Sequence, residues 1–146
     1  KNMNQYIEPL RIVASAAFEK GMLTCLETIL TGKELIDLLN LIDLPYVKVV
    51  YDTGNRVAFG HDLPNDIRLL GSRIAHVHIK DKNNKNENTL LGTGLVNFEQ
   101  VFHALNDINY YGPFTFETVR GSNPIKTAIY NMKVVDFFQE NSKVNV

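Results

Sequence analysis

The sequence has little of several features that would narrow its function. It contains one cysteine, Cys25, which excludes a disulfide within the chain and is typical of a reducing compartment, so the cytoplasm is the expected location. Lys and Arg number 15 against 16 acidic residues, which leaves no overall positive charge to attract nucleic acid or an anionic membrane. No apolar run approaches the roughly 18–20 residues that a membrane-spanning helix needs. We therefore expect neither nucleic acid nor membrane as a partner.

What the sequence does have is the balance of an ordinary globular protein. It is 146 residues long, 45% hydrophobic and 10% aromatic. This is the length of one average domain, with enough apolar side chains to form a core. We treat residues 1–146 as a single domain.

Helix-like and strand-like segments alternate along the chain. Apolar stripes at helical spacing, together with capping or stop residues, mark 3–18, 31–42, 62–70, 97–108 and 123–135. Short β-rich runs mark 22–28, 46–52, 74–81 and 112–118. The residues between the second run and Asp62 are expected to form a loop.

This alternation predicts an α/β fold with a parallel sheet built from right-handed crossover units. Four such units are present, whereas a closed (β/α)8 barrel has eight and takes about 250 residues. Two architectures remain open at this point. One is half of a closed barrel, and the other is a small open sheet with helices on both faces.

Each predicted strand carries, near its carboxyl end, a residue that can bind a metal ion. These residues are Glu27, Asp52, His78 and Glu117, and successive ones are separated by the length of a strand–helix unit. Because the carboxyl ends of parallel strands meet at one edge, we expect the four side chains to converge there. Three carboxylates and one imidazole favour Mn²⁺ or Mg²⁺, with Zn²⁺ or Co²⁺ as alternatives. A cation would also offset the repulsion among three acids.

Each of these residues taken alone has an ordinary structural interpretation. Glu27 and Glu117 are compatible with surface carboxylates, and Asp52 precedes Thr-Gly, as a turn residue often does. His78 competes for the ligand role with His76, two residues earlier on the same face of the strand. His78 lies nearer the loop and is favoured.

Three further polar residues are candidates for binding substrate. Asn55 is either a turn residue or a hydrogen-bonding partner of the substrate. Lys80 either holds an anionic substrate group or is solvated, as most lysines are. Arg120 precedes the helix that begins near Asn123, where barrels often bind phosphate, although a surface arginine fits equally well.

Five segments lie at the strand ends or in the loops after them: "CLET" at 25–28, "YDTGN" at 51–55, "HVHIKD" at 76–81, "LGTGLVNF" at 91–98 and "YGPFTFET" at 111–118. In these segments the chain resembles the xylose isomerase-like barrel superfamily of sugar phosphate isomerases and epimerases, to which the second family of abasic-site endonucleases is related. Five segments in order cover most of the chain. The resemblance implies a (β/α)8 barrel of which strands five to eight are present, so 1–146 would be its C-terminal half.

The resemblance also implies an activity and the residues that perform it. Glu27, Asp52, His78 and Glu117 would be the metal ligands of an isomerase or epimerase that acts on a small sugar or sugar phosphate. Glu27 and Glu117 would exchange a proton beside the substrate carbonyl, through an enediolate. A lyase that dehydrates a keto-inositol, like inosose dehydratase, is an alternative on the same site.

Two other interpretations remain, a nuclease, which is the weaker, and a half barrel without catalytic activity. The endonucleases carry a histidine where this chain has Asn55, and a further histidine in the loop after the third strand, where "NKNENTLLGTG" has none. A nuclease is therefore disfavoured. A half barrel without catalytic activity would expose its sheet edges, and it would pair with a second copy or with the missing N-terminal half.

Overall fold

The computed structural model describes residues 4–142. Its strands are β1 (Thr24–Leu26), β2 (Val47–Asp52), β3 (Ile74–Ile79) and β4 (Phe114–Phe116). Its helices are α1 (Asn4–Phe18), α2 (Gly32–Ile42), α3 (Thr53–Ala58), α4 (Leu63–Leu70), α5 (Phe98–Asp107) and α6 (Pro124–Ser142), with a short 3₁₀ helix at Gly71–Arg73. The predicted alternation of strands and helices is confirmed.

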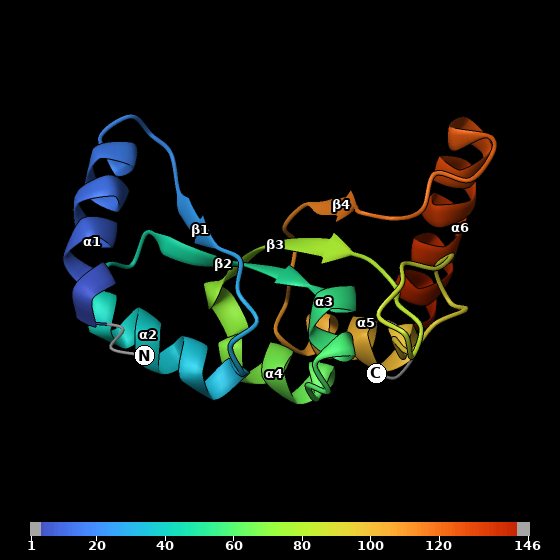
Figure 1. Ribbon diagram of the computed structural model, residues 1–146, viewed down its shortest axis with the longest axis horizontal. Coiled ribbons are helices and arrows are strands. Elements are labelled where there is room, and N and C mark those ends of the chain that lie inside the picture. The colour runs from blue at the N-terminus through green and yellow to red at the C-terminus, as the bar shows by residue number, and fades with distance from the viewer. Residues whose placement is uncertain (1–3, 143–146) are drawn as a thin grey trace.

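The four strands form one parallel sheet in the order β1-β2-β3-β4. Helices α2, α4 and α5 lie along one side of this sheet, while α1 and α6 flank its two ends (Figure 1). Neighbouring helices contact one another in the order α1, α2, α4, α5 and α6. An open doubly wound sheet would carry helices on both faces, so the arrangement is that of half a (β/α)8 barrel.

Side-chain alternation on the two central strands explains which face is covered. In β2, Val47, Val49 and Tyr51 are buried toward the helices, and in β3 Val77 and Ile79 do the same. They pack with apolar side chains of the helices, among them Leu35, Ile42, Ile67, Val101 and Leu105. Each such side chain stabilises the fold by about 1.5–3 kcal/mol on burial. The intervening residues, which include His76 and His78, are turned to the opposite face.

Predicted capping residues begin the helices that cover the sheet. Thr31 and Glu34 form the expected capping box of α2, with the Thr31 side chain and the Glu34 carboxylate each bonding the other's backbone N–H. The side chains of Asp62 and Asn97 cap α4 and α5. These contacts satisfy N–H groups that the first helical turn leaves free.

The prediction of a loop after the second strand is wrong, because the first six residues of this segment form α3. The Asp52 carboxylate caps this helix by accepting the N–H of Asn55. The Thr53 hydroxyl bonds both the backbone N–H and the carbonyl of Lys80, which directly follows the neighbouring strand β3. Capping and tertiary bonds thus outweigh the turn preference of Thr-Gly-Asn.

The long polar segment after β3 is organised by one buried carboxylate. Asp81 accepts hydrogen bonds from the backbone N–H groups of Lys82, Gly92, Gly94 and Val96. A side chain at Gly94 would overlap the Asp81 carboxylate, so the close approach requires glycine there. The loop is therefore an ordered part of the fold.

The two ends of the half barrel carry exposed apolar side chains. On α1 they include Ile12 and Val13, and on α6 they include Ile125, Ile129 and Phe137. Strands β1 and β4 are the edges of the sheet. Within residues 4–142 no helix is long and apolar enough to cross a membrane.

Candidate metal centre

The four predicted ligands lie at one rim of the sheet, at the carboxyl ends of the strands. Asp52 is the last residue of β2 and is paired with His78 of β3. Glu27 directly follows β1, and Glu117 directly follows β4. The N–H of Glu117 donates to the carbonyl of Ile79, which extends the strand pairing up to Glu117 itself. Parallel strands in register therefore bring together residues that are far apart in the sequence.

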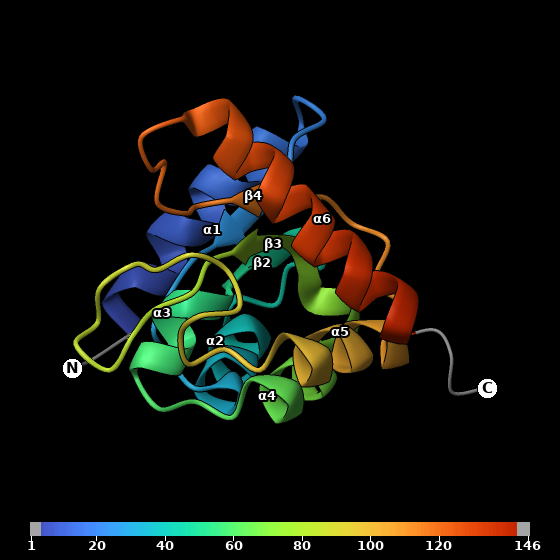
Figure 2. The same ribbon diagram turned by 90° about the vertical axis from the view of Figure 1, so that its right-hand side faces the viewer.

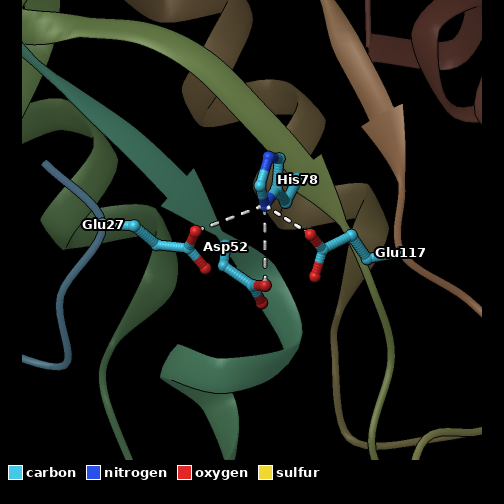
Figure 3. Close-up of side chains that lie close together, drawn as sticks. All are labelled: Glu27, Asp52, His78 and Glu117. Atoms are coloured by element: carbon cyan, nitrogen blue, oxygen red, sulfur yellow. Dashed lines mark ion pairs between the residues drawn. The ribbon is translucent and has the colours of Figure 1, made fainter. Parts of the chain in front are cut away.

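The side chains of these four residues point toward a common centre (Figure 3). Each offers one ligand atom, and these atoms all lie within 4.8 Å of one another. His78 Nδ1 lies 3.2 Å from Glu117 Oε1, 3.8 Å from Glu27 Oε2 and 4.0 Å from Asp52 Oδ2. Atoms bound to one Mn²⁺ or Mg²⁺ at about 2.1 Å lie at most about 4.2 Å apart. Small side-chain shifts would thus close the cluster around an ion.

The surroundings of His78 fit a divalent cation. Its Nδ1 atom is buried and makes no hydrogen bond with any of residues 4–142, although it faces three carboxylates. A buried polar atom without a partner is rare in folded proteins, and an ion in the centre would satisfy this one together with the carboxylate oxygens. The donor set itself, three hard oxygens and one nitrogen, suits the same group of metals as predicted.

Lys80 is joined to two of the candidate ligands. Its Nζ lies 2.8 Å from Asp52 Oδ2 and 2.5 Å from Glu117 Oε2, and the residue is 7% exposed. The interpretation of Lys80 as a solvated surface lysine is therefore wrong. Binding of a substrate anion by Lys80 stays a prediction.

These contacts shift the pKa of both partners. Burial alone lowers the pKa of Lys80, but its hydrogen bonds to Asp52 and Glu117 outweigh that effect and raise it above its ordinary value. The hydrogen bond from Lys80 lowers the pKa of Glu117, against the opposing effect of burial. Glu117 is thus held as a carboxylate at neutral pH.

Asn55 supports Asp52. Its backbone N–H donates to Asp52 Oδ1 at 2.7 Å, and its side-chain amide donates to Asp52 Oδ2 at 3.1 Å. Asn55 lies in the first turn of α3, and its two hydrogen bonds orient the carboxylate of Asp52. Its predicted contact with substrate stays a prediction.

His76 and Arg120 lie outside the cluster. His76 Nε2 is 2.7 Å from Thr115 Oγ1, and its ring packs edge-on against His78 at a centroid distance of 5.1 Å. His76 thus contacts a threonine of β4 and takes no part in the cluster. Arg120 is exposed in the segment between β4 and α6, and binding of phosphate there stays a prediction.

Sequence reasoning missed the roles of Thr53 and Gly54. Thr53 bonds the backbone of Lys80, and a side chain on Gly54 would overlap the Lys80 stem, with Cγ only 2.6 Å away. The available indication was a Thr-Gly pair directly after a strand that ends in a candidate ligand. Nothing in the sequence indicated that this pair contacts Lys80, which follows β3.

Curated relatives of this chain carry the names of inosose dehydratases and of L-ribulose or L-ribulose-5-phosphate epimerases. The inosose dehydratase of Clostridium perfringens (strain 13 / Type A) is 27% identical over 154 residues, covering 88% of this chain and 52% of the relative. The putative L-ribulose-5-phosphate 3-epimerase SgbU of Escherichia coli (strain K12) is 32% identical over 90 residues, covering 56% and 32%. The chain spans about half the length of these relatives or less.

Solved structures share the fold. A structure of L-ribulose 3-epimerase superposes with a TM-score of 0.85 at 19% identity, covering 96% of this chain and 55% of that one. A xylose isomerase-like TIM barrel protein from Mycobacterium smegmatis, solved in complex with magnesium, gives a TM-score of 0.74 at 19% identity, with coverages of 94% and 50%. The sequence model of the xylose isomerase-like TIM barrel family matches residues 1–136, so the chain belongs to that family.

Proposed function

We propose that this chain carries the metal centre of a sugar or sugar phosphate isomerase or epimerase that depends on a divalent cation. The observation that carries the proposal is the convergence of Glu27, Asp52, His78 and Glu117 at one rim. Relatives named as sugar epimerases support the substrate class. Because the chain spans about half of its relatives, the activity is proposed for the whole protein.

The four side chains are proposed to bind Mn²⁺ or Mg²⁺, with Zn²⁺ or Co²⁺ as alternatives. The magnesium bound by the related Mycobacterium smegmatis protein supports a hard cation. When bound, such an ion polarises a substrate carbonyl and stabilises the negative charge that develops on its oxygen. The remaining steps belong to side chains of the protein.

Glu27 and Glu117 are proposed to exchange the proton. They follow β1 and β4, the two edge strands, and so approach the centre from opposite sides (Figure 3). One carboxylate would remove the proton from the carbon beside the carbonyl, which gives an enediolate. The other, present as the carboxylic acid, would donate its proton to the opposite face, which inverts that carbon. Lys80 keeps Glu117 ionised and so suited to accept a proton.

A dehydratase on the same site is the second candidate. The match to inosose dehydratase over 88% of this chain favours it. Proton removal beside the carbonyl would then be followed by loss of the hydroxyl group of the neighbouring carbon, which leaves as water after taking a proton from the protonated glutamate. Analysis of the products formed from ketoses and from a keto-inositol separates the two reactions.

Asn55, Lys80 and Arg120 are proposed to contact the substrate, with Arg120 available for a phosphate group. A nuclease is not proposed, because position 55 is asparagine and the loop after β3 lacks histidine. Nucleic acid and membranes are not proposed as partners. The cytoplasm is the proposed location, which the single cysteine supports.

Proton exchange tests the proposal directly. In D₂O with Mn²⁺ and a ketose, the whole protein should incorporate deuterium at the carbon beside the carbonyl, and EDTA should stop the exchange until Mn²⁺ is restored. Glu27→Gln or Glu117→Gln should reduce the rate at least about a hundredfold, as expected for loss of a general acid or base. Glu140→Gln, an exposed change on α6, is the matched control and should leave the rate unchanged. Exchange that persists in both site variants would overturn the mechanism.

A further inference from the structure

Lys80 is held from its backbone to its ammonium group by three consecutive residues. Thr53 bonds the Lys80 backbone, Gly54 leaves the space that the Lys80 stem fills, and Asp52 accepts the ammonium group at 2.8 Å. Glu117 completes the enclosure from the other side. These contacts hold the whole Lys80 side chain, including its ammonium group, in one position.

The net charge of the side chains at this rim matches that of a divalent cation. Glu27, Asp52 and Glu117 contribute three negative charges when ionised, and Lys80 contributes one positive charge. With a neutral His78 the net charge is −2, which a divalent cation cancels. Without Lys80 the same site would carry −3.

Lys80 would lie close to any ion in the centre. Asp52 Oδ2 is the atom that faces His78 Nδ1, and it also accepts the Lys80 ammonium at 2.8 Å. An ion bound to this oxygen at about 2.1 Å would thus lie within about 5 Å of Nζ. At that distance two cations in a partly buried site repel each other strongly.

From this geometry we propose that Lys80 is the built-in counter-charge of the metal centre. It offsets one of the three carboxylates, restrains the affinity of the site, and sets its preference for divalent over trivalent cations. This inference rests on the proposed metal site but does not depend on which reaction the protein catalyses. Lys80 acts here as a positioning residue, through Asp52 and Glu117.

Metal titration of the purified chain tests the inference. Binding of Mn²⁺ is measured by calorimetry and binding of Tb³⁺ by luminescence, in wild type and in Lys80→Met. Removal of the ammonium group should tighten Mn²⁺ binding about tenfold or more, and it should tighten Tb³⁺ binding further, because Coulomb attraction grows with ionic charge. Lys85→Met removes the same charge from the exposed loop and should change both constants less than about twofold.

The outcomes separate this inference from the proposed metal site. Weaker or unchanged Mn²⁺ binding in Lys80→Met, or an unchanged ratio of the Tb³⁺ and Mn²⁺ constants, would overturn the counter-charge while leaving the metal site in place. Absence of Mn²⁺ binding in wild type would overturn both. If circular dichroism shows that Lys80→Met is unfolded, Lys80→Gln keeps a hydrogen-bond donor and should give the same two shifts.

Discussion

At the scale of single residues, the centre depends on side chains that hold other side chains. Asn55 and Lys80 between them occupy both oxygens of Asp52, and Lys80 also holds Glu117. The directions of the Asp52 and Glu117 carboxylates are thus fixed before any ion or substrate binds, which lowers the cost of ordering the site on binding.

The contact between Lys80 and Glu117 gives a defined dependence of stability on pH. The folded-state pKa of Glu117 lies below its ordinary 4.5, so its contribution is present above pH 4.5 and is lost as the pH falls through the lowered pKa. The folded-state pKa of Lys80 lies above its ordinary 10.5, so its contribution is lost only as the pH rises through that higher value.

We expect wild type to be more stable than Glu117→Gln at pH 7 by about 0.5–1 kcal/mol, because the carboxylate is partly exposed. That difference should shrink at pH values below 4.5. Urea unfolding of both proteins at pH 7 and at a pH below 4.5 measures this difference in the free energy of unfolding. If the difference in unfolding free energy is the same at both pH values, the ion pair between Glu117 and Lys80 does not stabilise the fold.

At the scale of elements, the sequence predicted best where one signal was strong. Thr31 with Glu34, and the alternation around Val77 and Ile79, were sufficient to place α2 and β3. The Thr53–Ala58 helix was missed because its stability comes from Asp52 and Lys80, which local propensity does not register. For the same reason the candidate ligands were predictable from strand ends, whereas the ion pairs of Lys80 were not.

The ordered loop after β3 makes a testable case at this scale. In Asp81→Asn the side chain keeps its shape but loses its charge and one of its acceptor oxygens, while four backbone N–H groups still point at it. We expect a loss of about 2 kcal/mol in the free energy of unfolding. Hydrogen exchange should rise across residues 82–96. Asp37→Asn, an exposed change on α2, should cost less than about 0.5 kcal/mol.

At the scale of the whole molecule, the described structure is half of a closed architecture. Strands β1 and β4 are the edges of the sheet, and α1 and α6, which carry exposed apolar residues, stand at its two ends (Figures 1 and 2). Sheet edges and contiguous apolar surfaces favour association. We propose that the complementary half of the barrel covers them in the whole protein, and that a second copy does so when this chain is alone.

Light scattering on the purified chain tests the second part of that proposal. We expect a mass about twice the 16.5 kDa of a single chain. Ile12→Glu on α1 combined with Ile129→Glu on α6 should return the mass to that of one chain, because both positions are at least half exposed and apolar. A folded wild-type monomer at high concentration would contradict the pairing.

Asp52 ends β2 and caps α3 with the same carboxylate. The start of α3 and the direction of a candidate ligand consequently depend on the same side chain and on its hydrogen bond with the N–H of Asn55. Anyone who redesigns this rim to accept a different ion has to rebuild the turn at residues 52–55 as well, since neither can be altered while the other is kept.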